Sequence, residues 1–409
     1  MNILIVTDSY PPEIRSASHL MQELACELKN RGHKITVITT YPRYNLVEEF
    51  KEKVFQEFVN EDGINVIRIK TLSHHKVNFN YRGFAQLTMP FLFYFKGKKY
   101  FDKNIDLVIV YSPPLPLALF GKFIKNKYNA KYVLNVQDIF PQNAIDLKIL
   151  TNPILIKFFE YIENQAYKSA DEITVHSEGN KKFLLQSKNI DPNKLHILHN
   201  WIDVDLYIKA KNEGRFRKKY GLEEKFIFLF AGVTGPAQEL DLVINAASQL
   251  QDLKDACFLI VGDGTKKEHL VKLSQSLELK NVIFKPFVSK DEYPFLVKEA
   301  NVGIVCLSNK NKTPVVPGKI LGYMASSIPV LAFLNKESDA HLLIKEANCG
   351  FTMTSDNHKE AASLIMNIYK QRDSLKIYGE NGLKYVLNHF EKGICVSRLE
   401  RLFGALNGR

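Results

Sequence analysis

Short runs rich in β-branched residues alternate with helical patterns along most of this chain. The first run, residues 1–7, is followed by a helical pattern over residues 16–31 and by a second run at residues 34–39. Strands separated by helices imply a parallel sheet that is covered on both faces. Such sheets bind ligands beyond the carboxyl ends of their strands. The alternation therefore predicts an α/β fold with its ligand sites in the loops that follow the strands.

The alternation occurs in both halves of the chain. Further strands are expected at residues 106–111, 131–136, 172–176, 195–198, 226–231, 256–261, 281–284, 302–307 and 328–333. The only tryptophan, Trp201, precedes a weakly periodic charged stretch at residues 209–225. Because 409 residues exceed what one hydrophobic core usually supports, two domains are expected, with a boundary near Trp201. The chain beyond residue 357 is predicted to be mostly helical.

Composition narrows the class of protein further. An apolar fraction of 45% with 24% charged residues is typical of a soluble globular chain. Residues 1–7 lack a basic leader and a cleavage site, so they are interpreted as a strand and not as a signal peptide. No apolar run approaches the ~20 residues needed to cross a bilayer. The five cysteines are far apart, which suggests neither a disulfide framework nor a zinc site and fits a reducing cytoplasm.

The net charge of +11 indicates an anionic partner, which could be nucleic acid, anionic lipid or a phosphorylated metabolite. Residues 77–101 interleave aromatic side chains with Arg82, Lys96, Lys98 and Lys99. That pattern suits the interface of an anionic membrane and an acceptor held there. A core helix with a basic exposed end is the alternative. Nucleic acid is not expected, because no helix-turn-helix, zinc-finger or RNP signature accompanies the charge.

One loop between two predicted strands carries the strongest signal for an anionic ligand. Pro317 and Gly318 suit a helix entrance, since proline lacks an N–H that the first turn cannot use and glycine lets another group approach the backbone. Lys319 then lies in the first turn, where the helix dipole disfavours a cation unless an anion offsets the cost. A bound phosphate would explain this lysine, and a solvated lysine is the alternative.

Three other loops follow strands and precede helices. Arg15 and Ser16 end the loop after the first strand, where a phosphate or sugar could be held, although a solvated arginine is the alternative. Residues 232–239 and 262–267 are glycine-bearing turns that match neither the dinucleotide fingerprint nor a Walker loop. Together with Lys319, these two turns favour a nucleoside diphosphate as the ligand.

The chain resembles family 4 of the retaining glycosyltransferases, which have the GT-B fold, and within it the bacterial O-antigen and capsule enzymes similar to fucosamine transferases. The motifs that carry the resemblance extend over nearly the whole chain: Tyr10-Pro-Pro-Glu13, Arg31-Gly-His33, Ser112-Pro-Pro-Leu-Pro-Leu-Ala118, Gln137-Asp-Ile-Phe-Pro-Gln142, His199-Asn-Trp201, Gly262-Asp-Gly264, Pro317-Gly-Lys319 and Tyr323-Met-Ala325. The resemblance implies two facing Rossmann-like domains with a deep cleft between them. Residues 1–201 would hold the acceptor, residues 202–389 the nucleotide-sugar, and a C-terminal helix at 390–409 would pack back on the first domain.

The resemblance also assigns roles to single residues. Those expected at the donor are Gly232 and Gln238 in one loop, Gly264 and Lys267 at the diphosphate, Phe287 near the base, and Pro317, Gly318 and Lys319 near the distal phosphate and ribose. Asp138 resembles a polar residue of the cleft wall. The two glutamates typical of the family fall on Pro314 and Gly322 here. Neither side chain can hydrogen-bond a sugar, so backbone groups or other side chains must orient the donor.

The function that this resemblance implies is transfer of a hexosyl or N-acetylhexosaminyl group, with retention, from a nucleotide-sugar to a saccharide acceptor. A UDP-sugar donor and a lipid-linked acceptor in O-antigen, lipopolysaccharide or capsule synthesis are expected, at the inner face of the cytoplasmic membrane. Asp138 and Lys319 are the expected catalytic residues. No metal or other cofactor is expected, and the two-aspartate motif at Asp203 and Asp205 falls in the linker. The alternatives are a nucleotide-sugar 2-epimerase and a non-catalytic nucleotide-sugar-binding or lipid-binding protein.

Overall fold

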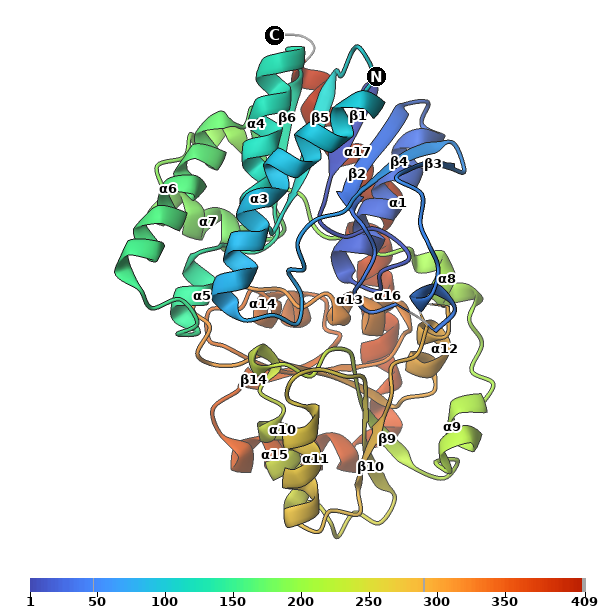
Figure 1. The fold of residues 1–409 in the computed structure, drawn as a ribbon. Helices are drawn as coiled ribbons and strands as arrows, with labels where there is room; N and C mark the ends of the chain where they lie inside the picture. Colours follow the sequence, from blue (N-terminus) through green and yellow to red (C-terminus); the bar gives the residue numbers. More distant parts are fainter. Residues whose placement is uncertain (47, 290, 407–409) are drawn as a thin grey trace. The chain divides into compact units, whose positions relative to one another are not determined.

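The computed structural model describes residues 1–46, 48–289 and 291–406. The chain divides into two compact units (Figure 1). Unit 1 comprises Met1–Asn200 together with the C-terminal residues from Gly393, and unit 2 comprises Trp201–Lys392. The domains predicted from the sequence were residues 1–201 together with residues 390–409, and residues 202–389. Each unit contains its own sheet and is described by itself.

The sheet of unit 1 has the strand order β3-β4-β2-β1-β5-β6-β7-β8. Its strands are β1 (Asn2–Val6), β2 (Lys34–Thr40), β3 (Phe58–Glu61), β4 (Ile64–Ile69), β5 (Leu107–Ser112), β6 (Lys131–Val136), β7 (Glu172–Val175) and β8 (Leu195–Ile197). All neighbours are parallel except β3 and β4, which form an antiparallel hairpin that the sequence analysis did not predict. Asp62 and Gly63 both have positive φ in its two-residue turn, as such hairpins require. The strand order reverses between β1 and β5.

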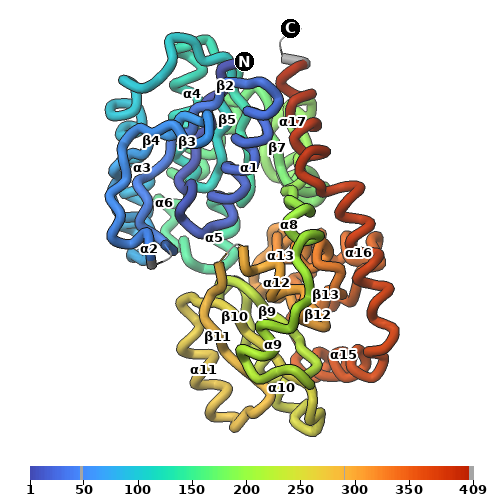
Figure 2. Tube along the Cα trace, turned by 90° about the vertical axis from the view of Figure 1, so that its right-hand side faces the viewer, coloured from blue at the N-terminus to red at the C-terminus, as the bar shows by residue number. Residues whose placement is uncertain are grey.

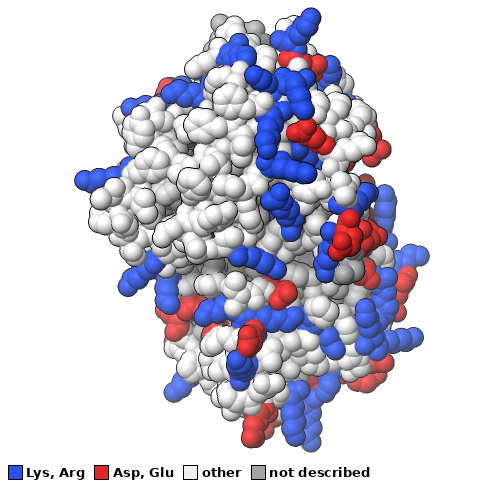
Figure 3. Space-filling view, viewed as in Figure 1, with Lys and Arg blue, Asp and Glu red and all other residues white. Residues whose placement is uncertain are grey.

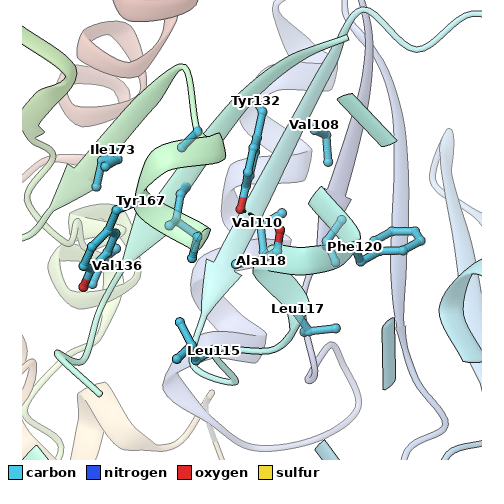
Figure 4. Close-up of a cluster of buried hydrophobic side chains, with 14 of the residues drawn as sticks. Val108, Val110, Leu115, Leu117, Ala118, Phe120, Tyr132, Val136, Tyr167 and Ile173 are labelled. Atoms are coloured by element: carbon cyan, nitrogen blue, oxygen red, sulfur yellow. Dashed lines mark hydrogen bonds between the residues drawn. The ribbon is translucent and has the colours of Figure 1, made fainter. Parts of the chain in front are cut away.

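Helices cover the sheet of unit 1. They are α1 (Ser16–Asn30), α2 (Glu48–Lys51), α3 (Phe79–Gly97), α4 (Leu117–Tyr128), α5 (Gln142–Asp146), α6 (Pro153–Ser169), α7 (Glu178–Ser187) and α17 (Lys392–Leu406), with short 3-10 turns at η1 (Lys98–Tyr100) and η2 (Pro192–Lys194). Figure 4 shows the core where α4 meets β5 and β6. The buried Tyr132 donates its hydroxyl to the Ala118 carbonyl at 3.2 Å. A Cβ atom at Gly121 would lie 2.7 Å from that ring, so only glycine fits there.

The C-terminal helix α17 is attached to the end of α1 and to the turn between α1 and β2, within unit 1 (Figure 2). Arg31, which ends α1, donates to the Gly393 carbonyl at 3.0 Å and to Ser397 Oγ at 2.8 Å. The Arg31 guanidinium also pairs with the Glu400 carboxylate, whose other oxygen lies 3.0 Å from His33 Nε2. These contacts connect residues more than 360 positions apart in sequence.

The sheet of unit 2 has the order β11-β10-β9-β12-β13-β14, with every pair parallel. Its strands are β9 (Phe226–Ala231), β10 (Ala256–Val261), β11 (Val282–Lys285), β12 (Val302–Cys306), β13 (Val330–Leu334) and β14 (Gly350–Thr354). Its helices are α8 (Val204–Lys209), α9 (Arg215–Tyr220), α10 (Asp241–Ser248), α11 (Lys267–Ser276), α12 (Tyr293–Lys298), α13 (Lys319–Ala325), α14 (Ala340–Glu346), α15 (His358–Lys370) and α16 (Lys376–His389), with 3-10 turns η3 (Pro236–Gln238) and η4 (Arg372–Ser374). The predicted strands of this half and the helical C-terminal region are confirmed, whereas β14 was not predicted. The strand order reverses between β9 and β12.

Candidate active site

Tyr323 opens the sheet of unit 2 at the point where the strand order reverses. β9 and β12 pair over only two residues, which end at Gly303 and Leu229. Past this short pairing, the Tyr323 hydroxyl lies between the two strands. It accepts a hydrogen bond from the Ala231 N–H at 3.2 Å and lies 3.2 Å from the carbonyl oxygens of Leu229 and Ile304. A Cβ at Gly303 would lie 2.4 Å from the tyrosine ring. The tyrosine thus replaces the missing ladder hydrogen bonds and separates two strands at the crevice where such sheets bind ligands.

The glycine-bearing loops after β9 and β10 are packed backbone against backbone. A Cβ atom would lie 1.9 Å from the Gly232 carbonyl oxygen if placed on Gly262, and 2.3 Å from the Thr234 carbonyl oxygen if placed on Gly264. All three glycines have φ between +145° and +156°, a region that side chains disfavour. The two predicted turns therefore form one rigid platform at the carboxyl edge of the sheet.

Lys319 reaches that platform from the other side of the crevice. It is the first residue of α13, as predicted, and its side chain crosses to Gly232, where a Cβ atom would lie 2.4 Å from Lys319 Cε. The ammonium lies 4.9 Å from the centre of the Phe230 ring. Desolvation lowers the pKa of Lys319 to about 8. No carboxylate pairs with this ammonium in the part of the chain that the structure describes. A desolvated cation without a counter-charge is costly, so the site is suited to an anionic ligand.

Other predicted donor residues lie along the same edge. Gln238 Oε1 accepts from the Gly235 N–H at 3.0 Å, so this oxygen stabilises its own loop. Lys267 begins α11 and its backbone N–H donates to the Gly264 carbonyl at 3.1 Å. Phe287 follows β11 and is exposed. Pro317 accepts from the Ile320 N–H just before α13, and Gly318 is exposed beside it.

The loop that delivers Lys319 is held by two buried residues that the sequence analysis missed. Asn335 Nδ2 donates to the Thr313 carbonyl at 3.3 Å, and Ser338 Oγ donates to the Val315 carbonyl at 2.5 Å. Both residues follow β13, so the neighbouring strand fixes the path of the chain into α13. The only sequence signal was a pair of polar residues directly after an apolar run.

Arg15 in unit 1 differs from Lys319 because the protein itself compensates its charge. Arg15 precedes Ser16, the exposed first residue of α1. One Arg15 guanidinium nitrogen donates to Asp8 Oδ2 at 3.0 Å and lies 3.1 Å from His75 Nε2. Burial alone would raise the pKa of Asp8, but Arg15 and the two histidines hold it well below its usual range. Arg15 is therefore oriented by a fixed network.

Asp8, His74 and His75 form a group with the composition of a metal site, their ligand atoms lying within 4.8 Å of one another. The Arg15 nitrogen already uses the Asp8 and His75 lone pairs that an ion would need. Burial, Arg15 and His74 lower the pKa of His75 to about 3, so this ring stays neutral and accepts from the guanidinium. The ring also stacks on Tyr44, with centroids 4.7 Å apart. The group is better suited to holding an arginine than a cation.

Asp138 and Arg82 belong to the same electrostatic cluster as Arg15. Partial desolvation by the surrounding protein raises the pKa of Asp138, although the residue is exposed at the surface. The charges of Arg82 and Arg15 act on this pKa in the opposite direction. Burial lowers the pKa of Arg82, and Asp8 and Asp138 oppose that change. The neighbouring Gln137 accepts from Asn200 Nδ2 at 2.7 Å. Asp138 thus lies in a charged environment, as expected of a residue that meets a polar ligand.

The basic stretch at the end of α3 and in η1 is less available than the sequence suggested. Lys99 pairs with Glu57 at 2.9 Å, and Lys96 donates to the Lys70 carbonyl at 3.1 Å. Lys98 lies about 6.0 Å from the ring centre of Phe95. The ion pair with Glu57 therefore largely compensates the charge of Lys99. The sequence did not indicate this pair, because Glu57 lies next to β3, in a distant part of the chain.

Two family models match the chain. The model described as Glycosyltransferase Family 4 matches residues 17–206, and the model described as Glycosyl transferases group 1 matches residues 212–385. Similar curated proteins include the Probable glycosyltransferase WbjE of Pseudomonas aeruginosa, which is 26% identical over 70% of this chain and 72% of its own length. WcaI of Escherichia coli (strain K12), named for colanic acid biosynthesis, is 24% identical over 80% of this chain and 81% of its own length.

A third relative covers about half of each chain. It is the N-acetylgalactosamine-N,N'-diacetylbacillosaminyl-diphospho-undecaprenol 4-alpha-N-acetylgalactosaminyltransferase of Campylobacter jejuni, 28% identical over 52% of this chain and 54% of its own length. Among solved structures, sucrose-phosphate synthase from Thermosynechococcus elongatus gives a TM-score of 0.77 at 13% identity, covering 100% of this chain and 99% of that one. Anabaena Alr3699/HepE in complex with UDP and glucose gives a TM-score of 0.73 at 14% identity, covering 99% of this chain and 100% of that one.

The fold and these likenesses define the class as GT-B, with two Rossmann-like domains, which confirms the predicted fold class. The two family models together account for most of the chain, one on each unit. The chain therefore belongs to the glycosyltransferases, of the family 4 type. Its placement in the branch similar to fucosamine transferases stays a prediction. The curated relatives favour a transferase over the epimerase and the non-catalytic alternatives.

Proposed function

We propose that this glycosyltransferase moves a sugar from a nucleoside-diphosphate donor, a UDP-sugar, to a saccharide acceptor with retention of configuration. The uncompensated Lys319 ammonium beside Gly232 carries the proposal, because a diphosphate supplies the missing negative charge. The similar Anabaena protein was solved with UDP and glucose. Gly264 and Lys267 lie on the neighbouring loop, where they would contact the same diphosphate.

The proposed chemistry is a front-face displacement. The bond between the anomeric carbon and the donor phosphate oxygen breaks while the acceptor oxygen bonds to the same face, and a donor phosphate oxygen takes the acceptor proton. Positioning and charge stabilisation of the leaving diphosphate would supply the rate enhancement, with Lys319 and Lys267 as the cations. Fixed cations make a metal unnecessary in this scheme. Asp138 would bind the polar groups of the acceptor, and Asp138→Asn is expected to lower turnover if it does.

The proposed acceptor is a lipid-linked saccharide of surface polysaccharide synthesis. The similar Escherichia coli protein is named for colanic acid biosynthesis, and the Campylobacter jejuni relative is named for a diphospho-undecaprenol substrate. In unit 1, the cluster of Arg15, Arg82 and Asp138 offers charged groups for an acceptor. The assignment of Arg15 and Ser16 to the donor remains a prediction.

Donor and reaction type can be tested together by incubating the purified protein with UDP-, GDP- and ADP-sugars without an acceptor. The proposal predicts slow hydrolysis of a UDP-sugar that Lys319→Ala abolishes. Isomerisation of the sugar without release of UDP would indicate an epimerase. Binding without either reaction would indicate a non-catalytic protein, and both of these results would contradict the proposal.

We further propose that unit 1 attaches to an anionic membrane at its α3–α6 face. On α3, Phe84, Phe91 and Phe95 are 59%, 65% and 64% exposed, and on α6 Tyr161 is 63% exposed. Figure 3 shows that the surface over α3, α4 and α6 is mostly free of charged side chains. No helix among the described residues is long and apolar enough to cross a membrane. Exposed aromatics beside lysines suit attachment to a bilayer surface.

Co-sedimentation with vesicles containing phosphatidylglycerol tests this attachment. Replacing Phe91 and Phe95 by serine is expected to abolish binding, and Lys96→Gln with Lys98→Gln should weaken it by about 10- to 30-fold, at about 1 kcal/mol per charge. The double variant Lys218→Gln with Lys219→Gln on α9 is the matched control. Wild-type protein that stays in the supernatant would contradict the proposal.

A further inference from the structure

Gly322 marks a place in unit 2 where two tyrosine hydroxyls meet the backbone of α13. Gly322 is buried, and a Cβ atom placed on it would lie 3.4 Å from the Tyr207 hydroxyl oxygen and 3.5 Å from the Tyr293 hydroxyl oxygen. The two rings come from α8 and α12, with centroids 6.5 Å apart and planes at 87°. Both rings are partly exposed. Three helices thus converge on one small polar patch, which we call the tyrosine pair.

The tyrosine pair lies close to Lys319. Residues three apart in a helix share a face, so Gly322 follows Lys319 on the same side of α13, one turn or about 5 Å further along. The lysine side chain reaches Gly232, and the tyrosine hydroxyls lie beside Gly322. A ligand with an anionic group at the ammonium can therefore present other polar groups to the tyrosine pair.

The Tyr293 hydroxyl has capacity for such a group. No hydrogen bond of this hydroxyl is recorded within residues 1–46, 48–289 and 291–406. Burial raises the pKa of Tyr293, so the phenol stays protonated and can both donate and accept. A side chain longer than alanine at position 322 would compete with both hydroxyls for the same space. The absence of a side chain at position 322 leaves the space beside the two hydroxyls open.

We propose that Tyr207 and Tyr293 bind the vicinal hydroxyls of the pentose in a nucleoside diphosphate whose phosphate lies at Lys319. This inference rests on the proposed function and specifies how this chain recognises a ribonucleotide. Two phenol hydroxyls, each a donor and an acceptor, complement a diol. They supply the side-chain contacts that Pro314 and Gly322 cannot make. Nucleotides without the diol lose these contacts and bind more weakly.

Calorimetric titration with UDP and with 2′,3′-dideoxy-UDP tests the assignment. For the wild type, UDP is expected to bind at least 10-fold more tightly than the dideoxy nucleotide. Tyr293→Phe should weaken UDP binding by about 3- to 10-fold, the worth of one hydrogen bond, and leave dideoxy-UDP binding unchanged. Tyr207→Phe should behave in the same way. Phenylalanine keeps the ring packing, so the fold is retained.

Tyr369→Phe on α15 is the matched control, because its hydroxyl bonds to Asp255 in a hydrophobic cluster separate from the one that contains α13, so the variant should change the affinity for neither nucleotide. If Tyr293→Phe lowers the affinity for both nucleotides equally, or for neither, the proposed role of the tyrosine pair is overturned. The proposed class of donor is not affected by that result. A folded wild type that binds none of UDP, GDP and ADP would overturn the proposed function and this inference together.

Discussion

Each of the two sheets carries a basic residue where its strand order reverses, and the two residues are treated differently. Arg15, after β1, donates to Asp8 and contacts His75. Lys319, after β12, lies on Gly232 and an aromatic ring, and within the described residues no acidic side chain pairs with it. Unit 1 therefore compensates its cation internally, whereas unit 2 leaves its cation for a ligand. The same topology thus supports a positioned arginine in one unit and an anion-binding lysine in the other.

The largest expected effect distinguishes the two cations directly. Lys319→Met should lower turnover by about 10²- to 10³-fold, because it removes a charge aimed at the leaving diphosphate. It should not lower the free energy of unfolding, since an unpaired desolvated ammonium costs stability. Steady-state kinetics and urea denaturation of the same preparation measure both quantities. Wild-type turnover in this variant would remove Lys319 from the mechanism.

Arg15→Met should instead lower the stability of the protein. It leaves the Asp8 carboxylate, which is 2% exposed, without its guanidinium, and the free energy of unfolding should fall by about 3 kcal/mol. Lys34→Met, which breaks the exposed pair with Asp102, is the control and should cost less than about 1 kcal/mol. Equal stability of the two variants would show that Arg15 is not held by its network as described.

Gly232→Ala tests the contact between the platform and Lys319. The added Cβ would lie 2.4 Å from Lys319 Cε in a backbone region that side chains disfavour, so stability should fall by about 2 kcal/mol and donor KM should rise. Gly404→Ala on α17 meets no atom within 4 Å and should be neutral or slightly stabilising. An unchanged donor KM in Gly232→Ala would place the ligand elsewhere.

The smallest effect is a pH dependence restricted to unit 2. With a pKa of about 8, Lys319 loses its charge as pH rises, so UDP affinity should fall by up to about 10-fold per pH unit above 8. The folded-state pKa lies below the ordinary lysine value of 10.5, so the ammonium destabilises the fold below pH 8, and this cost is relieved between pH 8 and about 10.5. Affinity and stability curves of Lys319→Met should lack both features. An identical affinity curve in that variant would contradict the assignment.

Local patterns predicted more of the fold than of the sites. The strands β6, β9 and β10 were predicted to the residue, because continuous apolar runs are what a buried parallel strand requires. β14 was missed, since each of its residues is only partly buried and its composition is mixed. A strand that is buried on both faces therefore has a continuous apolar sequence that is easy to identify, whereas a strand that is only partly buried has a mixed sequence that is not.

The candidate site shows the same division. Lys319 was found because proline, glycine and lysine stand together at a helix entrance. The contacts of Arg15 with His75, 60 residues away, and of Gly322 with Tyr207 depend on long-range packing that no local pattern records. The compensation of Lys99 by Glu57 was missed for the same reason. The charged groups could be identified from the sequence. Which of them remain available for a ligand depends on contacts that only the fold brings about.

The most direct test of an anion-binding lysine is the titration of the Lys319 side chain by NMR, with and without UDP. We expect a pKa of about 8 for Lys319 in the free protein, rising by one unit or more when UDP binds, because the diphosphate stabilises the charged form. A pKa that does not change on saturation with UDP would contradict it.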